Sequence, residues 1–164
     1  MFNRIAGIKK AKFCYLCKMM ETTDEKYMRE ALKEAQQAFN EGEIPVGAVI
    51  VSNGKILARA HNLTQRLNDP TAHAEMQAIT SATHAIGGKY LTNCTLYVTL
   101  EPCIMCAGAL FWAQIERIVY GASDPKRGYR LVAQNLLHPK TIVENGLLEK
   151  ECSNLLLMFF KEKR

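Results

Sequence analysis

Two short segments of the chain hold residues that can bind a metal ion and move a proton. His73 and Glu75 lie two positions apart in the first segment, and Cys103 and Cys106 lie three positions apart in the second. One imidazole and two thiolates suit Zn²⁺, and three protein ligands leave the fourth tetrahedral position open for water, as in catalytic zinc sites. We therefore predict one catalytic zinc ion per chain bound by His73, Cys103 and Cys106, with Glu75 as the acid–base residue beside it.

The spacing of these residues predicts that both segments open a helix. Pro102 suits the first turn of a helix, which puts Cys103 and Cys106 at positions i and i+3 on one helix face. Both sulfur atoms can then reach a single ion. The N-terminal end of a helix also lowers the pKa of a thiol and favours the thiolate that binds zinc. A second helix should open at His73, so that His73 and Glu75 both lean toward its open end.

The alternative for the same residues is a structural zinc module with four protein ligands and no catalysis. The remaining candidates for a fourth ligand are His61, His84, Cys94 and Cys152. None of them has zinc-finger spacing beside another ligand, and this alternative gives Glu75 no role. Cys14 and Cys17 form a second Cys-x-x-Cys pair, but no His or Cys pair lies near them in the sequence, so we expect them to bind no metal.

The composition of the 164-residue chain is that of a globular domain. It is 48% hydrophobic and 23% charged, and the length suffices for one domain with a sizeable core. No segment approaches the about 20 apolar residues needed to cross a bilayer, so we expect no membrane partner. Six cysteines, two of them in the metal motif, argue for a reducing compartment, the cytoplasm, rather than for a disulfide framework.

The first 20 residues differ from the rest of the chain. They contain five of the 21 basic residues and no acidic residue, which leaves 16 basic against 16 acidic residues in positions 21–164. The net charge of +5 therefore comes from this segment. The overall charge does not indicate a nucleic-acid partner for the domain, and only a local basic patch would do so. We predict that residues 1–20 are a dispensable N-terminal extension and that residues 21–164 form the domain.

Hydrophobic periodicity predicts the order helix, two strands, helix, strand, helix, two strands, helix. The expected helices lie between the capping box of Thr22 and Gly42, over residues 73–84, over residues 103–114 and after Gly146. The expected strands are residues 46–52, 55–60, 94–100, 118–120 and 141–144, and residues 122–138 should be a loop. This order favours an α/β fold with a mixed sheet covered by helices on both faces.

Longer stretches around these residues resemble one family. They are residues 45–49, 61–62, 69–75, 95–109 and 119–126. The pattern His-x-Glu followed by Pro-Cys-x-x-Cys marks the zinc-dependent deaminases of nucleobases, and the wider stretches resemble the bacterial tRNA-specific adenosine deaminases. The likeness covers roughly residues 22–164. It implies a three-layer α/β/α sandwich with a five-stranded mixed sheet, as in cytidine deaminases.

The resemblance also implies an activity and a set of functional residues. It implies a cytoplasmic homodimer that hydrolytically deaminates the wobble adenosine (position 34) of a tRNA anticodon, typically that of an arginine tRNA, to inosine. Glu75 would be its proton shuttle and His73, Cys103 and Cys106 its zinc ligands. The positions that match substrate-binding residues are Asn62 and Ala74 at the flipped purine, Asp124 at the neighbouring ribose, Glu43, Ile44 and Pro45 in the anticodon pocket, and Phe159 and Phe160 near the anticodon loop.

Two of these residues also have ordinary structural explanations. Asn62 and Asp124 are expected in loops, where such side chains commonly accept hydrogen bonds from nearby backbone N–H groups. Arg127, Tyr129 and Arg130 follow Asp124 at positions where members of the family vary. The sequence therefore leaves the contacts of this loop open.

Other features bear on the partners of the chain. Basic residues interleave with aromatic ones around Tyr129 and after Phe160, which suits a single-stranded RNA loop. Phe111 and Trp112 are adjacent and cannot both face one core, which favours a dimer. The alternative activity is deamination of a free base or nucleotide, such as guanine or cytosine, at the same metal site. Incubation with tRNA and with free bases separately distinguishes the two activities.

Overall fold

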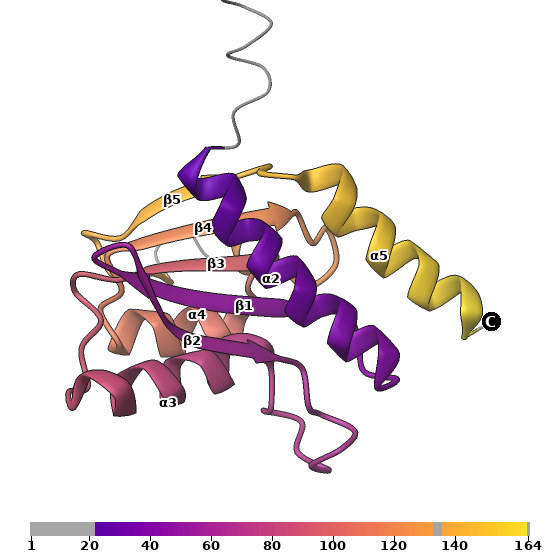
Figure 1. Ribbon diagram of the computed structural model, residues 1–164, viewed down its shortest axis with the longest axis horizontal. Coiled ribbons are helices and arrows are strands. Elements are labelled where there is room, and N and C mark those ends of the chain that lie inside the picture. The colour runs from indigo at the N-terminus through magenta and orange to yellow at the C-terminus, as the bar shows by residue number, and fades with distance from the viewer. Residues whose placement is uncertain (1–21, 133–135, 164) are drawn as a thin grey trace, which may run out of the picture.

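A five-stranded mixed sheet lies between two layers of helices (Figure 1). The computed structural model describes residues 22–132 and 136–163, so the predictions for residues 1–20 and for Cys14 and Cys17 lie outside the described residues. The helices are α2 (Thr23–Asn40), α3 (Ala74–Ile86), α4 (Ile104–Trp112) and α5 (Glu149–Glu162). The strands are β1 (Gly47–Ser52), β2 (Lys55–His61), β3 (Thr95–Leu100), β4 (Arg117–Ala122) and β5 (Ile142–Asn145). The predicted order of elements and the predicted fold class are confirmed.

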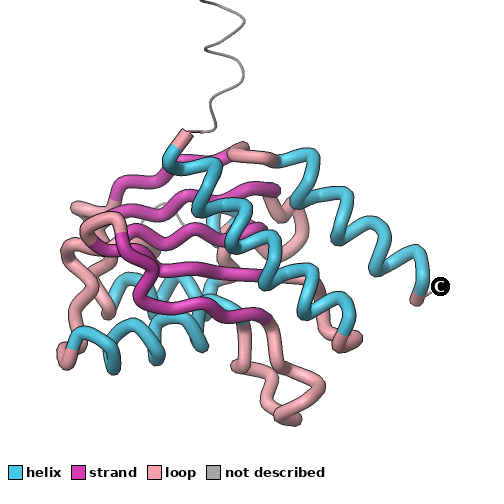
Figure 2. Tube along the Cα trace, in the orientation of Figure 1, coloured by secondary structure: helices cyan, strands magenta, loops and turns pink. Residues whose placement is uncertain are grey.

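The strands lie in the order β2-β1-β3-β4-β5 (Figure 2). Strand β1 pairs antiparallel with both β2 and β3, whereas β3, β4 and β5 run parallel. The predicted hairpin turn between β1 and β2 contains Asn53 and Gly54, both with positive φ (49° and 72°), as a tight two-residue turn requires. The carboxyl ends of the parallel strands share one edge of the sheet, which is where open α/β sheets place ligands.

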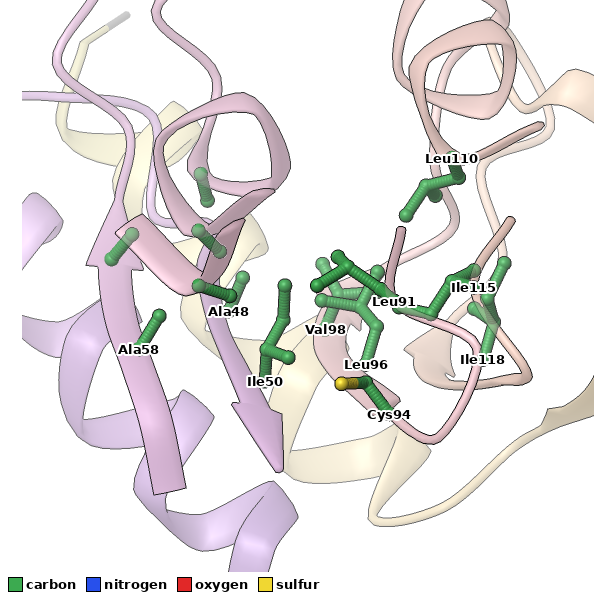
Figure 3. Packing of buried hydrophobic residues seen from close by; sticks show 14 of the residues in the cluster. Ala48, Ile50, Ala58, Leu91, Cys94, Leu96, Val98, Leu110, Ile115 and Ile118 are labelled. Atoms are coloured by element: carbon green, nitrogen blue, oxygen red, sulfur yellow. The ribbon is translucent and has the colours of Figure 1, made fainter. Parts of the chain in front are cut away.

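Each face of the sheet has its own hydrophobic core, because successive residues of a strand point to opposite faces. On one face, Ile50, Val98 and Ile118 pack with Leu110 of α4 and with the alanines of α3 (Figure 3). The cluster on the other face includes Tyr27, Met28, Ala31, Val49, Tyr97, Val119 and Cys152. Helices α3 and α4 thus share one face, and their N-terminal ends can meet at the same edge of the sheet.

Helix α2 crosses β1 at Gly47, where no side chain fits. A Cβ atom at this position would lie 2.0 Å from the carbonyl oxygen of Ala31 and 2.3 Å from the nitrogen of Ala35. The N–H of Gly47 donates to Oγ1 of Thr99 at 3.1 Å, which ties β1 to β3. The absence of a Cβ at Gly47 therefore sets how closely α2 approaches the sheet. No helix of the described residues has the length and apolar character needed to cross a membrane.

An ion-pair cluster fastens the start of α2 to the sheet. The predicted capping box of Thr22 and Glu25 is present, and Asp24 in the same turn binds the guanidinium of Arg117 at 2.6 Å and 3.0 Å. Arg117 also binds Glu144 of β5 at 2.9 Å. The hydrogen bonds from Arg117 hold the pKa of Asp24 below its usual value.

We expect Asp24→Asn to destabilise the protein in a pH-dependent way. Because the folded pKa of Asp24 is lowered, its contribution is fully present above the unfolded value of about 4 and is lost as the pH falls through the folded value. The variant should lose about 1 kcal/mol of unfolding free energy at pH 7, and the difference from the parent should shrink in acid. Urea unfolding at pH 7 and about pH 3 measures this. An equal loss at both pH values would contradict it.

Candidate active site

The three predicted metal ligands come together at the N-terminal ends of α3 and α4. His73 and Cys103 are the residues immediately before these helices, with extended backbone angles (φ −72° and ψ 156°; φ −74° and ψ 174°), and only Cys106 lies inside a helix. The prediction that His73 and Cys103 lie in the first helical turn is therefore wrong by one residue. Neither side chain makes a capping hydrogen bond to its helix, so both are available to a metal ion.

The spacing of the ligand atoms fits a tetrahedral zinc ion. Nδ1 of His73 lies 3.6 Å from Sγ of Cys103 and 3.5 Å from Sγ of Cys106, and all three atoms lie within 4.8 Å of one another. Zinc bound to nitrogen at about 2.0–2.1 Å and to sulfur at about 2.3 Å in a tetrahedron holds such atoms about 3.6 Å apart. The side chains are thus arranged as zinc would require.

This group among the described residues contains three ligands and no fourth. The four candidates considered for a fourth position lie elsewhere. Cys94 and Cys152 are buried in the two hydrophobic cores, His61 binds Glu34 at 3.1 Å, and His84 lies in the last turn of α3, at the other end of that helix. Three ligands leave room for a reacting water molecule, which is the property of a catalytic site. The geometry favours catalysis over the structural alternative.

The environment of the site shifts the ionisation of its side chains. Hydrogen bonding from Cys106 and then from His73 lowers the pKa of Cys103 to about 4, whereas the pKa of Cys106 is raised by its contact with Cys103. One thiolate is therefore present at neutral pH, ready for a cation. Burial is the main cause that raises the pKa of Glu75 to about 7. A carboxyl group with such a pKa can both accept and donate a proton near neutral pH.

Asn62 connects the end of β2 to the start of α3. It is 4% exposed, and its Oδ1 accepts a hydrogen bond from the N–H of Ala74 at 2.9 Å. Asn62 thus accepts a hydrogen bond from a backbone N–H, as expected. The donor is not in the loop of Asn62 but at the start of the helix that carries Glu75. Because Oδ1 is used in this way, the Nδ2 hydrogens are the donors that Asn62 can offer to a ligand.

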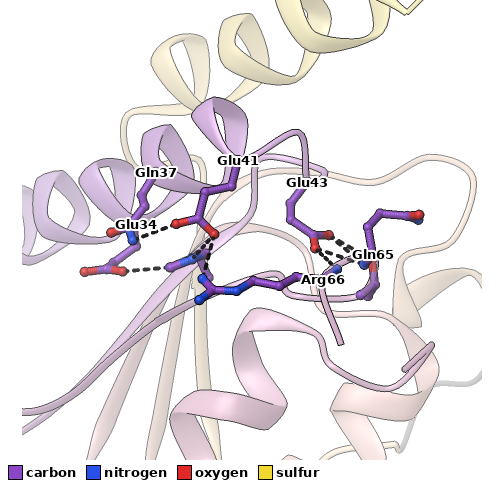
Figure 4. A network of polar contacts seen from close by, with 8 residues as sticks. Glu34, Gln37, Glu41, Glu43, Gln65 and Arg66 are labelled. Carbon is purple, nitrogen blue, oxygen red and sulfur yellow. Dashed lines mark hydrogen bonds and ion pairs between the residues drawn. The ribbon is translucent and has the colours of Figure 1, made fainter. Parts of the chain in front are cut away.

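Glu43 holds the loop between Asn62 and His73. Its carboxylate is 1% exposed and accepts hydrogen bonds from the hydroxyl of Thr64 at 3.1 Å and from the N–H groups of Gln65 at 2.9 Å and Arg66 at 2.8 Å (Figure 4). Of the other residues expected in the anticodon pocket, Ile44 is 37% exposed and Pro45 is buried. Ile44 is therefore the member of this group that presents its side chain to a partner.

The remaining expected contact residues divide between exposed and buried positions. Oδ1 of Asp124 accepts from the N–H groups of Lys126 at 2.9 Å and Arg127 at 3.0 Å, so this carboxylate shapes its own turn. Phe159 is buried and packs edge-on against Phe39 at 5.8 Å between ring centroids. Phe160 is 47% exposed, which makes it the ring of this pair that can meet a partner.

Sequence reasoning missed Glu101, a third buried carboxylate next to the site. It lies between β3 and the Pro-Cys-x-x-Cys motif and is 4% exposed. The signal for it was an acidic residue directly after a buried strand, where an unpaired charge is costly. Its partners could not be found in this way, because they lie in the segment that the sequence indicated only as a loop.

Comparisons with known proteins agree with this geometry. Residues 21–122 match the family described as the cytidine and deoxycytidylate deaminase zinc-binding region. The tRNA-specific adenosine deaminase of Bacillus subtilis (strain 168) is 49% identical over 148 residues, which are 87% of this chain and 92% of that protein.

Two solved structures are similar to the chain. One comes from a study of A-to-I editing by tRNA:A34 deaminases at the wobble position of transfer RNA; it aligns with a TM-score of 0.75 at 45% identity and covers 80% of this chain and 99% of its own. The other is guanine deaminase from Bacillus subtilis, with a TM-score of 0.58 at 42% identity over 60% of this chain and 64% of its own. The likeness to the tRNA deaminase is the more extensive of the two.

We expect Cys106→Ser to lose zinc affinity by about tenfold or more, because a hydroxyl group does not replace a thiolate ligand. Metal analysis of the purified variant after dialysis measures the loss. The matched control is Cys152→Ala, which removes a buried thiol from the core on the opposite face and should keep its zinc. Equal zinc contents in the two variants would contradict the proposed ligand set.

Proposed function

The chain belongs to the cytidine and deoxycytidylate deaminase family, and we propose that it deaminates the wobble adenosine (position 34) of a tRNA anticodon to inosine by zinc-dependent hydrolysis. The observation that carries this proposal is the group of His73, Cys103 and Cys106 with the buried Glu75 beside it. The extent of the likeness to tRNA-specific adenosine deaminases supports the choice of substrate.

The residues of the chain supply the proton transfers of this reaction. When bound, zinc supplies a Lewis acid that activates water for attack on C6 of adenine. Glu75 accepts one proton from the water and passes it to the purine ring. It then takes the proton of the new C6 hydroxyl and delivers it to the departing amino group, which leaves as ammonia. Its raised pKa of about 7 lets it serve both as base and as acid at neutral pH. One water molecule is consumed, and inosine and ammonia are released.

The purine is held next to this machinery by residues from different loops. We assign the Nδ2 donors of Asn62 and the backbone around Ala74 to the flipped base, the free oxygen of Asp124 to the neighbouring ribose, and the exposed side chains of Ile44 and Phe160 to the anticodon loop. Flipping is inexpensive in a loop that is already single-stranded. We propose an arginine tRNA as the substrate, because the chain resembles the tRNA-specific adenosine deaminases.

The proposed assembly is a cytoplasmic homodimer with one zinc ion per chain. Trp112 at the end of α4 is 77% exposed, and Ile104 at its start is 44% exposed. Apolar side chains exposed along one helix support a second copy of the chain as the partner. Light scattering that finds a monomer at micromolar concentration would contradict this assembly.

We expect the purified protein to convert adenosine 34 of an arginine tRNA transcript to inosine. Sequencing of the treated tRNA reads the product as an A-to-G change at this position. Free guanine, incubated in a parallel reaction, should release no ammonia. Ammonia from guanine with an unchanged tRNA would overturn the proposed substrate and favour the free-base activity.

We expect Glu75→Ala to keep its zinc and to lose deamination by about 10²–10⁴-fold or more, because Glu75 moves protons and is not a metal ligand. Single-turnover kinetics on an anticodon stem-loop, combined with metal analysis, separates the two properties. Loss of zinc together with activity would instead make Glu75 part of the metal site, and an active variant would remove it from the mechanism.

A further inference from the structure

The carboxylate of Glu101 is buried although it touches none of the three metal ligands through a hydrogen bond. Its side chain is 2% exposed, and it lies two residues before the zinc ligand Cys103. A buried carboxylate is stable only when several donors surround it. Both of its oxygens must therefore be hydrogen-bonded, and the identity of the donors indicates what the residue does.

All the donors come from one loop. Oε2 of Glu101 accepts from the N–H of Asp124 at 3.1 Å and from Nη2 of Arg130 at 3.2 Å. Oε1 accepts from Nε of Arg130 at 3.1 Å and from its backbone N–H at 3.3 Å. The two ends of the segment 124–130 are thus bound to the same carboxylate. This fixes the shape of the loop between them, which carries Lys126 and Arg127.

The middle of the loop lies directly on Glu101. A Cβ atom at Gly128 would lie 2.4 Å from Cδ of Glu101 and 2.6 Å from the carbonyl oxygen of Asp124. Gly128 has an ordinary φ of −58°, so the requirement here is for space and not for backbone freedom. The loop thus meets the carboxylate at Asp124, Gly128 and Arg130.

The same loop is joined to the zinc-binding segment. The N–H of Tyr129 donates to the carbonyl oxygen of Pro102 at 3.0 Å, and Gly128 forms an isolated β-bridge with Cys103. Tyr129 is 8% exposed and anchors this contact. The loop is therefore in direct backbone contact with the segment that carries Cys103.

We propose that Glu101 is a positioning residue that holds the loop of residues 123–130 beside the zinc site, so that Asp124 is placed for the ribose of the substrate. This inference rests on the proposed function. Glu101 acts through the loop and not on the reacting atoms, because all of its donors belong to that loop and proton transfer is assigned to Glu75. Arg130 adds the charged half of the contact.

A loosened loop should weaken substrate binding more than the chemical step. If the loop occupies the competent arrangement only part of the time, the apparent affinity falls by that fraction, whereas the bound complex still reacts. In Glu101→Gln the amide retains one acceptor oxygen but presents an NH₂ group to N–H donors. The backbone contacts of Pro102 and Cys103 do not depend on the carboxylate, so zinc should remain bound.

The test measures kcat and KM on an anticodon stem-loop for Glu101→Gln, Arg130→Gln and Gly128→Ala. We expect KM to rise about tenfold with kcat within about twofold, and zinc content to be unchanged. The matched control is Asp24→Asn, the same carboxylate-to-amide change in an arginine ion pair at the opposite end of β4; it should leave KM unchanged. A fall in kcat at constant KM, or an equal effect in the control, would overturn the proposal.

Two further measurements separate positioning from general stability. Hydrogen exchange of the segment 123–131 should speed up in Glu101→Gln and not in Asp24→Asn. Asp124→Ala should reduce kcat/KM less in the Glu101→Gln background than in the parent, because the contact of Asp124 with the substrate is already impaired there. If the effects of the two substitutions on kcat/KM were fully additive, the proposed mechanism would be wrong. If the parent protein fails to edit RNA, the proposed function fails, whereas the exchange measurement still decides whether Glu101 holds the loop.

Discussion

Three candidate metal ligands from two distant segments lie within 4.8 Å of one another, and the arrangement of the helices on the sheet makes this possible. His73 and Cys103 are 30 positions apart, and local structure alone cannot bring them together. The parallel pairing of β3 with β4 sends α4 across the same face of the sheet that α3 covers. Both helices then begin at one edge, and the residues that precede them face a common point.

Three buried glutamates around this point have different environments. Glu43 and Glu101 accept several hydrogen bonds each from loop N–H groups and hydroxyl or guanidinium donors, which offset the cost of burying their charge. Glu75 lies at the same edge, where burial dominates and raises its pKa to about 7. Two carboxylates therefore hold protein loops, and the third is suited to proton transfer. The same chemical group serves structure or catalysis according to its donors.

The features that could be predicted from the sequence are those that depend on residues close together in the chain. Hydrophobic periodicity and turn residues were sufficient for the order of elements, and motif spacing was sufficient to predict that His73, Cys103 and Cys106 lie together. The error of one residue at the helix starts arose because a residue before a helix and a first-turn residue look alike in sequence. The partners of Glu101 were missed for another reason: Arg130 lies 29 positions away, and no periodic pattern links a buried acid to a distant loop.

The metal centre by itself does not select a substrate. Three ligands and one proton shuttle suit any ring that carries an exocyclic amine, which is consistent with the likeness of the chain to both a guanine deaminase and a tRNA:A34 deaminase. Under the proposed function, we assign discrimination between substrates to the loop after Asn62 and the loop after Ala122. Glu43 binds N–H groups of the first loop, and Glu101 binds an N–H group of the second. Specificity would then depend on how two buried carboxylates anchor these two loops beside the metal group.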